Sequence, residues 1–157
     1  MSEVETEFLF EAQVKLAEPI HIGQTPQGYR MIVNTASGRC AGPRLNGEVL
    51  PMSGADWSLI RADGVGDLDV RMCIKTDDGA LIYVHWHGLM VFEPDEQDYA
   101  LDFQKPDDPA GAQRYYFRAA PRFETADERY AWLNKAICVT KSRTGGGGVF
   151  HRVFAVN

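Results

Sequence analysis

The chain has 157 residues, of which 45% are hydrophobic, and its formal net charge is −6. That length and composition fit one domain, residues 1–157, with an ordinary globular core. Nucleic-acid binders need a basic surface, which this acidic chain does not offer, so no nucleic-acid partner is expected. No apolar run approaches the roughly 20 residues of a membrane span, so no membrane partner is expected either.

The N-terminal residues 1–7 have neither the basic nor the apolar region of a secretory signal. Three cysteines, Cys40, Cys73 and Cys138, are odd in number and scattered along the chain. They suit a reducing compartment better than a disulfide framework. We therefore expect a cytoplasmic protein.

The first part of the chain has the pattern of β-strands. Residues 7–16 alternate apolar and polar side chains, which is typical of a half-buried strand, and Pro19 ends it. Residues 28–37 alternate again. Residues 39–50 contain two glycines and a proline, which predicts a bulged or bent strand.

A hairpin follows. Residues 68–75 and 81–87 both alternate, and Asp77-Asp78-Gly79 between them is a strong turn sequence. Opposed residues of an antiparallel pair point the same way, so the polar faces of these two strands are expected to be neighbours.

Residues 93–113 hold seven carboxylates and one lysine, which accounts for the whole net charge. Their length and composition predict an acidic loop, solvated or forming a lid over the domain. Further strands are predicted at residues 114–120, 136–141 and 149–156, with residues 145–148 as a glycine-rich hairpin loop.

One helix is predicted. Thr125 and Glu128 have the spacing of a capping box, in which the hydroxyl and the carboxylate satisfy backbone N–H groups at the start of a helix. The helix is expected over about residues 126–133. Many short strands and one short helix predict an all-β fold, a closed antiparallel barrel of about 8–10 strands. A two-sheet sandwich is the alternative.

Several motifs together resemble the family catalogued as domain of unknown function 3237. They are Gly42 and Gly47 before Val49-Leu50-Pro51, Gly54-Ala55-Asp56-Trp57, Arg61-Ala62-Asp63-Gly64, Leu68-Asp69-Val70-Arg71, Thr76-Asp77-Asp78-Gly79, Tyr116-Phe117-Arg118, Phe123-Glu124-Thr125 and Tyr130-Ala131-Trp132-Leu133-Asn134. The resemblance implies a small soluble β-barrel, often paired as a dimer. It implies little about activity.

Charged residues set among aromatic ones are the candidates for a ligand site. Asp69 and Arg71 share one strand face, and if that face lined the barrel they could bind a carboxylate, enolate or phenolate. An ion pair on the outer face is the alternative, since carboxylates near arginine form structural networks more often than sites. The full set of candidates is Asp56, Asp69, Arg71, Tyr83, Arg118, Glu124 and Trp132.

His85 and His87 share a strand face, as in some zinc sites, but zinc needs three or four ligands and the sequence places no third. We therefore expect no metal, and no motif indicates a cofactor.

The sequence leaves open whether the chain is an enzyme. The favoured hypothesis is a barrel that binds a small organic molecule, anionic or aromatic, and catalyses proton transfer, isomerisation or cyclisation of an organic acid, ketone or aromatic. The alternatives are a non-catalytic carrier and a structural or interaction protein with a filled barrel. Apolar residues on both strand faces, Leu9 against Phe8 and Phe10, predict a surface that needs covering and hence a homodimer.

Overall fold

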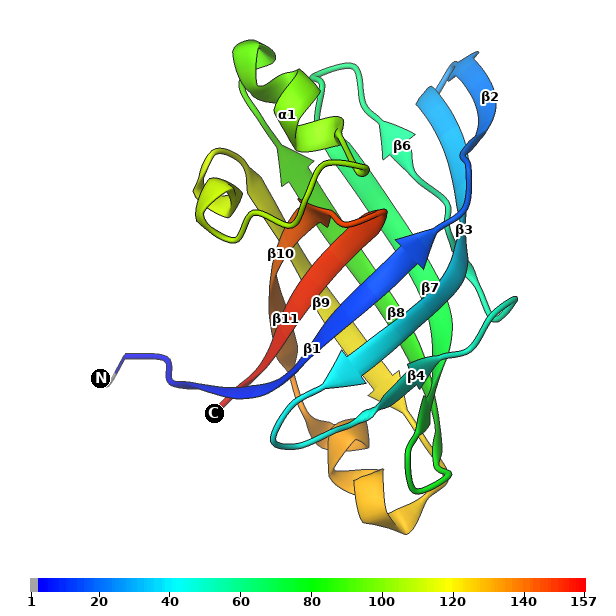
Figure 1. The fold of residues 1–157 in the computed structure, drawn as a ribbon, viewed down its shortest axis with the longest axis vertical. Coiled ribbons are helices and arrows are strands. Elements are labelled where there is room, and N and C mark those ends of the chain that lie inside the picture. Colours follow the sequence, from blue (N-terminus) through cyan, green and yellow to red (C-terminus); the bar gives the residue numbers. More distant parts are fainter. Residues whose placement is uncertain (1–2) are drawn as a thin grey trace.

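The computed structural model describes residues 3–157, and most of them form one antiparallel sheet closed into a barrel (Figure 1). The strands are β1 (Thr6–Leu16), β2 (Ile20–Thr25), β3 (Gly28–Ala41), β4 (Gly47–Val49), β5 (Ala55–Asp56), β6 (Leu59–Ile60), β7 (Gly66–Thr76), β8 (Leu81–Val91), β9 (Tyr116–Glu124), β10 (Cys138–Gly145) and β11 (Gly148–Val156). The predicted all-β barrel is confirmed.

The strand order around the barrel is β10-β11-β1-β3-β4-β7-β8-β9. The short strands β5 and β6 also lie between β3 and β7, and β2 forms a hairpin with β3. At the closure between β9 and β10, the backbone N–H of Ala119 donates to the hydroxyl of Thr140 at 2.9 Å. A side chain thus supplies a hydrogen bond where the two ends of the sheet meet.

The predicted helix exists, but it is a 3-10 helix, η3 (Glu128–Lys135), and begins two residues later than expected. The carboxylate of Asp127 caps it by accepting from the backbone N–H of Arg129 at 3.0 Å. Thr125 instead donates its hydroxyl to the carbonyl of Leu81 at 2.7 Å, so the capping box does not form. Among residues 3–157, no helix is both long and apolar enough to cross a membrane.

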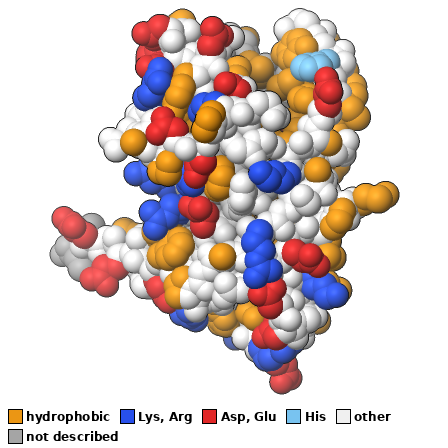
Figure 2. Space-filling model, viewed as in Figure 1, with side chains coloured by type: hydrophobic (Ala, Val, Ile, Leu, Met, Phe, Trp, Pro, Cys, Tyr) orange, Lys and Arg blue, Asp and Glu red, His pale blue; other side chains and the backbone are white. Residues whose placement is uncertain are grey.

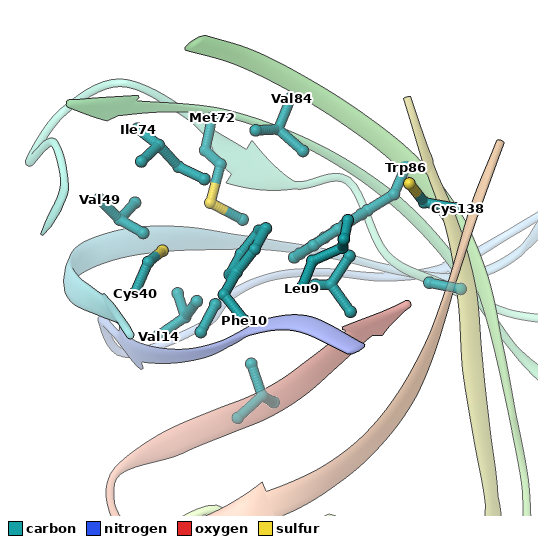
Figure 3. Close-up of a cluster of buried hydrophobic side chains, with 14 of the residues drawn as sticks. Leu9, Phe10, Val14, Cys40, Val49, Met72, Ile74, Val84, Trp86 and Cys138 are labelled. Atoms are coloured by element: carbon teal, nitrogen blue, oxygen red, sulfur yellow. The ribbon is translucent and has the colours of Figure 1, made fainter. Parts of the chain in front are cut away.

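A hydrophobic core fills part of the barrel interior (Figure 3). Phe10, Met72 and Trp86 reach into it from different strands. A β-bulge between Phe8 and Phe10 interrupts the alternation of β1, so that Leu9 and Phe10 are both fully buried, at 0% and 1% exposed. Leu9 is therefore a core residue, whereas Phe8 stays half-buried and packs against Phe154 and Arg152.

Residues 93–113 form a folded cap over one end of the barrel and not a solvated loop (Figure 1). They contain η1 (Pro94–Glu96), α1 (Gln97–Leu101) and η2 (Ala110–Gln113). The cap is bound to the turn between β10 and β11, where Gly147 N–H donates to the carbonyl of Phe103 and Gly146 N–H to that of Lys105, both at 2.8 Å. We call residues 93–113 the cap.

Candidate functional site: a cavity in the barrel

The end of the barrel nearest the cap holds a cavity of about 750 Å³. This volume is typical of pockets for small organic ligands. Its wall is mostly apolar. Leu68, Val70 and Met72 contribute from β7, and Trp86 and Met90 from β8. The interior of the barrel is therefore not completely filled, which contradicts the alternative of a filled barrel.

The cap and the β2–β3 hairpin border this cavity. Leu101 and Phe103 of the cap and His21 of β2 line it. Ile20 and Ile22 of β2 are about half exposed, and Figure 2 shows hydrophobic side chains gathered over this hairpin. The border of the cavity thus combines apolar side chains with the polar ones of Glu18, His21, Asp102 and Gln104.

Asp56 is the carboxyl group that projects from β5 into this apolar wall. It lies opposite Val33 on β3 and Val70 on β7, both of which also line the cavity. The strand can pack this tightly because residue 54 is glycine, since a Cβ there would lie 1.7 Å from the carbonyl oxygen of Arg71. The Gly54-Ala55-Asp56 sequence therefore places a carboxyl group inside the barrel.

Burial raises the pKa of Asp56 to about 7. The backbone N–H of Asp69 donates to its Oδ1 at 3.1 Å, which favours the charged form but offsets only part of the effect of burial. At neutral pH the carboxyl group is therefore near its midpoint of protonation.

His151 on β11 also lines the cavity and, unlike Asp56, is fully buried. Its ring lies against Trp86, with centroids 4.3 Å apart, and Phe117, at 5.6 Å. Burial lowers the pKa of His151 to about 3, so the imidazole is neutral at physiological pH. Its Nδ1 lies 2.7 Å from the hydroxyl of Ser142 on β10.

His151 was not among the site residues predicted from the sequence. The signal was present, because His151 shares a strand face with Val149, Val153 and Ala155, which are all buried. A histidine in the apolar series of a strand must either be partnered or face a cavity.

Asp69 and Arg71 lie on the outside of the barrel, so the hypothesis that they bind a ligand inside it was wrong and the alternative, an ion pair on the outer face, is confirmed. Their strand alternates, and its apolar residues Leu68, Val70 and Met72 take the inner face. The side chain of Arg71 is 42% exposed. Turning the charged face inward would have buried charges in an apolar interior at a high desolvation cost.

The predicted pairing of the polar faces across the hairpin is confirmed, but outside the barrel. Asp69 lies opposite His87, and Arg71 opposite His85. Nε2 of His85 is 3.0 Å from the carboxylate of Asp69, and the ligand atoms of Asp69, His85 and His87 lie within 4.8 Å of one another. The structure thus supplies a third possible metal ligand that sequence spacing could not place. Arg71, 3.4 Å from the same carboxylate, balances its charge without a metal.

The other predicted site residues also lie outside the cavity. Tyr83 is 42% exposed on the outer face of β8. Arg118 donates to the carbonyl of Phe117 at 2.8 Å. Glu124 is exposed at the end of β9. Trp132 packs under the guanidinium of Arg44, 4.3 Å from the ring centroid. Of the seven candidates, Asp56 alone is brought into the cavity.

A family model described as "Protein of unknown function (DUF3237)" matches residues 4–156. The chain belongs to this family. The DUF3237 protein is 36% identical over 140 residues to a UPF0311 protein of Clostridium acetobutylicum, covering 88% of this chain and 85% of the relative. A UPF0311 protein of Bradyrhizobium diazoefficiens is 34% identical over 139 residues, with 88% of each chain covered.

Solved structures share the fold. The crystal structure of a conserved protein of unknown function from Rhodopseudomonas palustris superposes with a TM-score of 0.89 at 28% identity, over 100% of both chains. One described as a beta-barrel like protein from Acinetobacter baumannii gives 0.84 at 30% identity, over 100% of this chain and 98% of the other. One described as an enzyme from Penicillium herquei gives 0.72 at 22% identity, over 100% and 97%, and shows a common fold only.

Proposed function

We propose that this DUF3237 protein binds a small, largely apolar organic molecule in the barrel cavity and moves a proton to or from it through Asp56. The observation that carries this proposal is a carboxyl group with a pKa of about 7 in the wall of an apolar cavity of about 750 Å³. General acid-base catalysis is most efficient when the pKa of the catalytic group is close to the working pH.

The composition of the wall narrows the substrate class. No lysine or arginine of residues 3–157 lines the cavity, and the arginines that the sequence analysis assigned to the ligand lie outside. A carboxylate substrate would therefore lose its hydration without gaining a cation. A neutral ketone, phenol or other aromatic with an acidic C–H or O–H fits better, so that proton transfer, isomerisation or cyclisation would begin by deprotonation at Asp56.

The second candidate is a carrier that uses the same cavity without catalysis. It is favoured by the apolar wall, which binds an aromatic molecule by burial alone. The two candidates differ in whether Asp56 is needed for turnover or only lies beside the ligand.

Catalysis and a carrier function can be distinguished by hydrogen exchange of 2-acetylnaphthalene with the solvent. The methyl protons beside its carbonyl are weakly acidic and exchange when a base removes them. In D₂O, the protein should accelerate their replacement by deuterium, followed by proton NMR, roughly 100-fold over buffer. Asp56→Asn should abolish the acceleration. Asp63→Asn, which changes an exposed carboxylate paired with Arg61, should retain it.

Binding of the ketone without accelerated exchange would contradict catalysis and favour the carrier. Failure of the ketone and of a wider panel of phenols and aromatic ketones to bind would contradict both candidates.

A further inference from the structure

His151 ends a chain of three hydrogen-bonded side chains behind the cavity wall. The backbone N–H of Ala119 donates to the hydroxyl oxygen of Thr140 at 2.9 Å. That oxygen is 2.9 Å from the hydroxyl of Ser142, which is in turn 2.7 Å from Nδ1 of His151. Thr140 and Ser142 are buried, at 2% and 1% exposed, so their protons must be satisfied within this chain.

The direction of the bonds follows from counting protons. The hydroxyl of Thr140 accepts from the N–H of Ala119 and has one proton to donate. The hydroxyl of Ser142 is the group that can accept this proton. If Thr140 donates to Ser142, then Ser142 donates its own proton to Nδ1 of His151, and every proton has an acceptor. In the reverse direction the proton of Thr140 would be buried without an acceptor, at a cost of about 1–3 kcal/mol. The neutral imidazole therefore accepts at Nδ1 and carries its proton on Nε2.

Nε2 opens into the cavity. Among residues 3–157, every side-chain nitrogen or oxygen that is fully enclosed has a hydrogen-bond partner. Nε2 of His151 makes no hydrogen bond to the described protein, so it is not enclosed. The residue is 4% exposed and lines the cavity, so a ligand reaches Nε2 from the cavity.

We infer that the Nε2–H of His151 is a fixed hydrogen-bond donor that anchors an oxygen acceptor of the ligand, such as a ketone, ester or enolate oxygen. This inference rests on the proposed function and adds the polar contact that orients the ligand. A donor held at one angle by Ser142 and two aromatic rings needs no reorganisation when negative charge develops on the ligand oxygen.

His151 and Asp56 then have different roles: His151 donates a hydrogen bond to the ligand, and Asp56 exchanges a proton with it. β11 and β5 are separated around the barrel by β1 and β3. Both groups line the same cavity, so one bound ketone can contact the two of them. The lowered basicity of the imidazole keeps it a neutral donor while Asp56 exchanges the proton.

The tautomer is tested directly on the unmodified protein. Long-range ¹H–¹⁵N correlation spectra of ¹⁵N-labelled protein at pH 7 should show His151 protonated at Nε2 and unprotonated at Nδ1, with the ring assigned through its connection to the backbone resonances of residue 151. A proton on Nδ1 of His151, or a charged ring, would overturn the inference.

The anchoring is tested with two isosteric probes, 2-acetylnaphthalene and 2-isopropenylnaphthalene, which differ in C=O against C=CH₂. The parent protein should bind the ketone about 2- to 10-fold more tightly after correction for the water solubility of each probe, the scale of one neutral hydrogen bond. His151→Phe should bind the two equally. In the parent, the ketone and not the alkene should shift the Nε2–H resonance.

The outcomes are distinguishable. Equal affinities in the parent protein would overturn the anchor and leave ligand binding by the cavity intact. Binding of neither probe up to its solubility limit would overturn the cavity function and the anchor with it.

Discussion

Asp56 and His151 both line the cavity, Asp56 half-buried and His151 buried, and loss of hydration moves their pKa values in opposite directions because it penalises the charged form of each. The pKa of Asp56 rises from its ordinary 3.8 to about 7, and that of His151 falls from 6.5 to about 3. Both groups are thereby biased toward neutrality, which is what an apolar ligand requires of the wall that it contacts.

The two shifts have opposite effects on stability. Between pH 4 and 7 folded Asp56 holds a proton that the unfolded chain releases, so its contribution to stability is lost as the pH rises. Between pH 3 and 6.5 the unfolded chain protonates His151 and the folded protein does not, so stability rises with pH. In the parent protein these slopes largely cancel.

Asp56→Asn should remove one of the two slopes. Relative to the parent, its free energy of unfolding should increase by about 1 kcal/mol per pH unit between pH 4.5 and 6.5, measured by urea denaturation at several pH values. Asp63→Asn is the control, because Arg61 lowers the pKa of that exposed carboxylate and keeps it charged across this window. A flat difference between Asp56→Asn and the parent would show that this carboxyl group titrates normally.

Among the elements, the cap is the one that closes the cavity, and Arg143 of β10 ties it to the barrel. The guanidinium is 8% exposed and lies 2.6 Å from Asp107 of the cap and 3.0 Å from Glu11 of β1. One buried cation thus neutralises carboxylates from two elements that are distant in sequence.

Arg143→Met keeps the aliphatic part of the side chain but leaves both carboxylates without their cation. The free energy of unfolding should fall by about 1–3 kcal/mol, less than for a fully buried pair because each carboxylate is about a third exposed. Arg39→Met removes an exposed pair with Asp77 and should change stability by less than about 1 kcal/mol. Equal effects of the two variants in chemical denaturation would contradict the special role of Arg143.

Strand periodicity was sufficient to predict most elements and the hairpin around Gly79, because alternation is a local property. Alternation divides β7 into two faces but does not show which face lies inside the barrel. The hypothesis that Asp69 and Arg71 lie on the inner face was therefore wrong. The apolar face of β7 takes the inner side because burying apolar side chains is more favourable than burying charged ones. The sequence could not connect His151 to a site because its partners Ser142 and Trp86 lie on other strands.

At the scale of the molecule, the sheet closes into a barrel, so we expect two copies to associate through an outer face of the barrel. Leu89 and Val91 of β8 are 41% and 40% exposed, and Tyr116 of β9, opposite Val91, is 50% exposed. These adjacent apolar side chains form a patch on the outside of the barrel, whereas Leu9, on which the sequence-based expectation of a dimer depended, is buried.

We propose that this patch of Leu89, Val91 and Tyr116 joins two copies in a symmetric dimer, since a two-fold interface brings the same surface of both chains together. Light scattering at micromolar concentration should give twice the chain mass of 17.5 kDa. Val91→Glu should yield a monomer, because two carboxylates would be desolvated at the interface without partners. Met52→Glu, at a 98% exposed position on a turn elsewhere, should leave the dimer intact. A monomeric parent protein, or a dimer that survives Val91→Glu, would exclude this face as the interface.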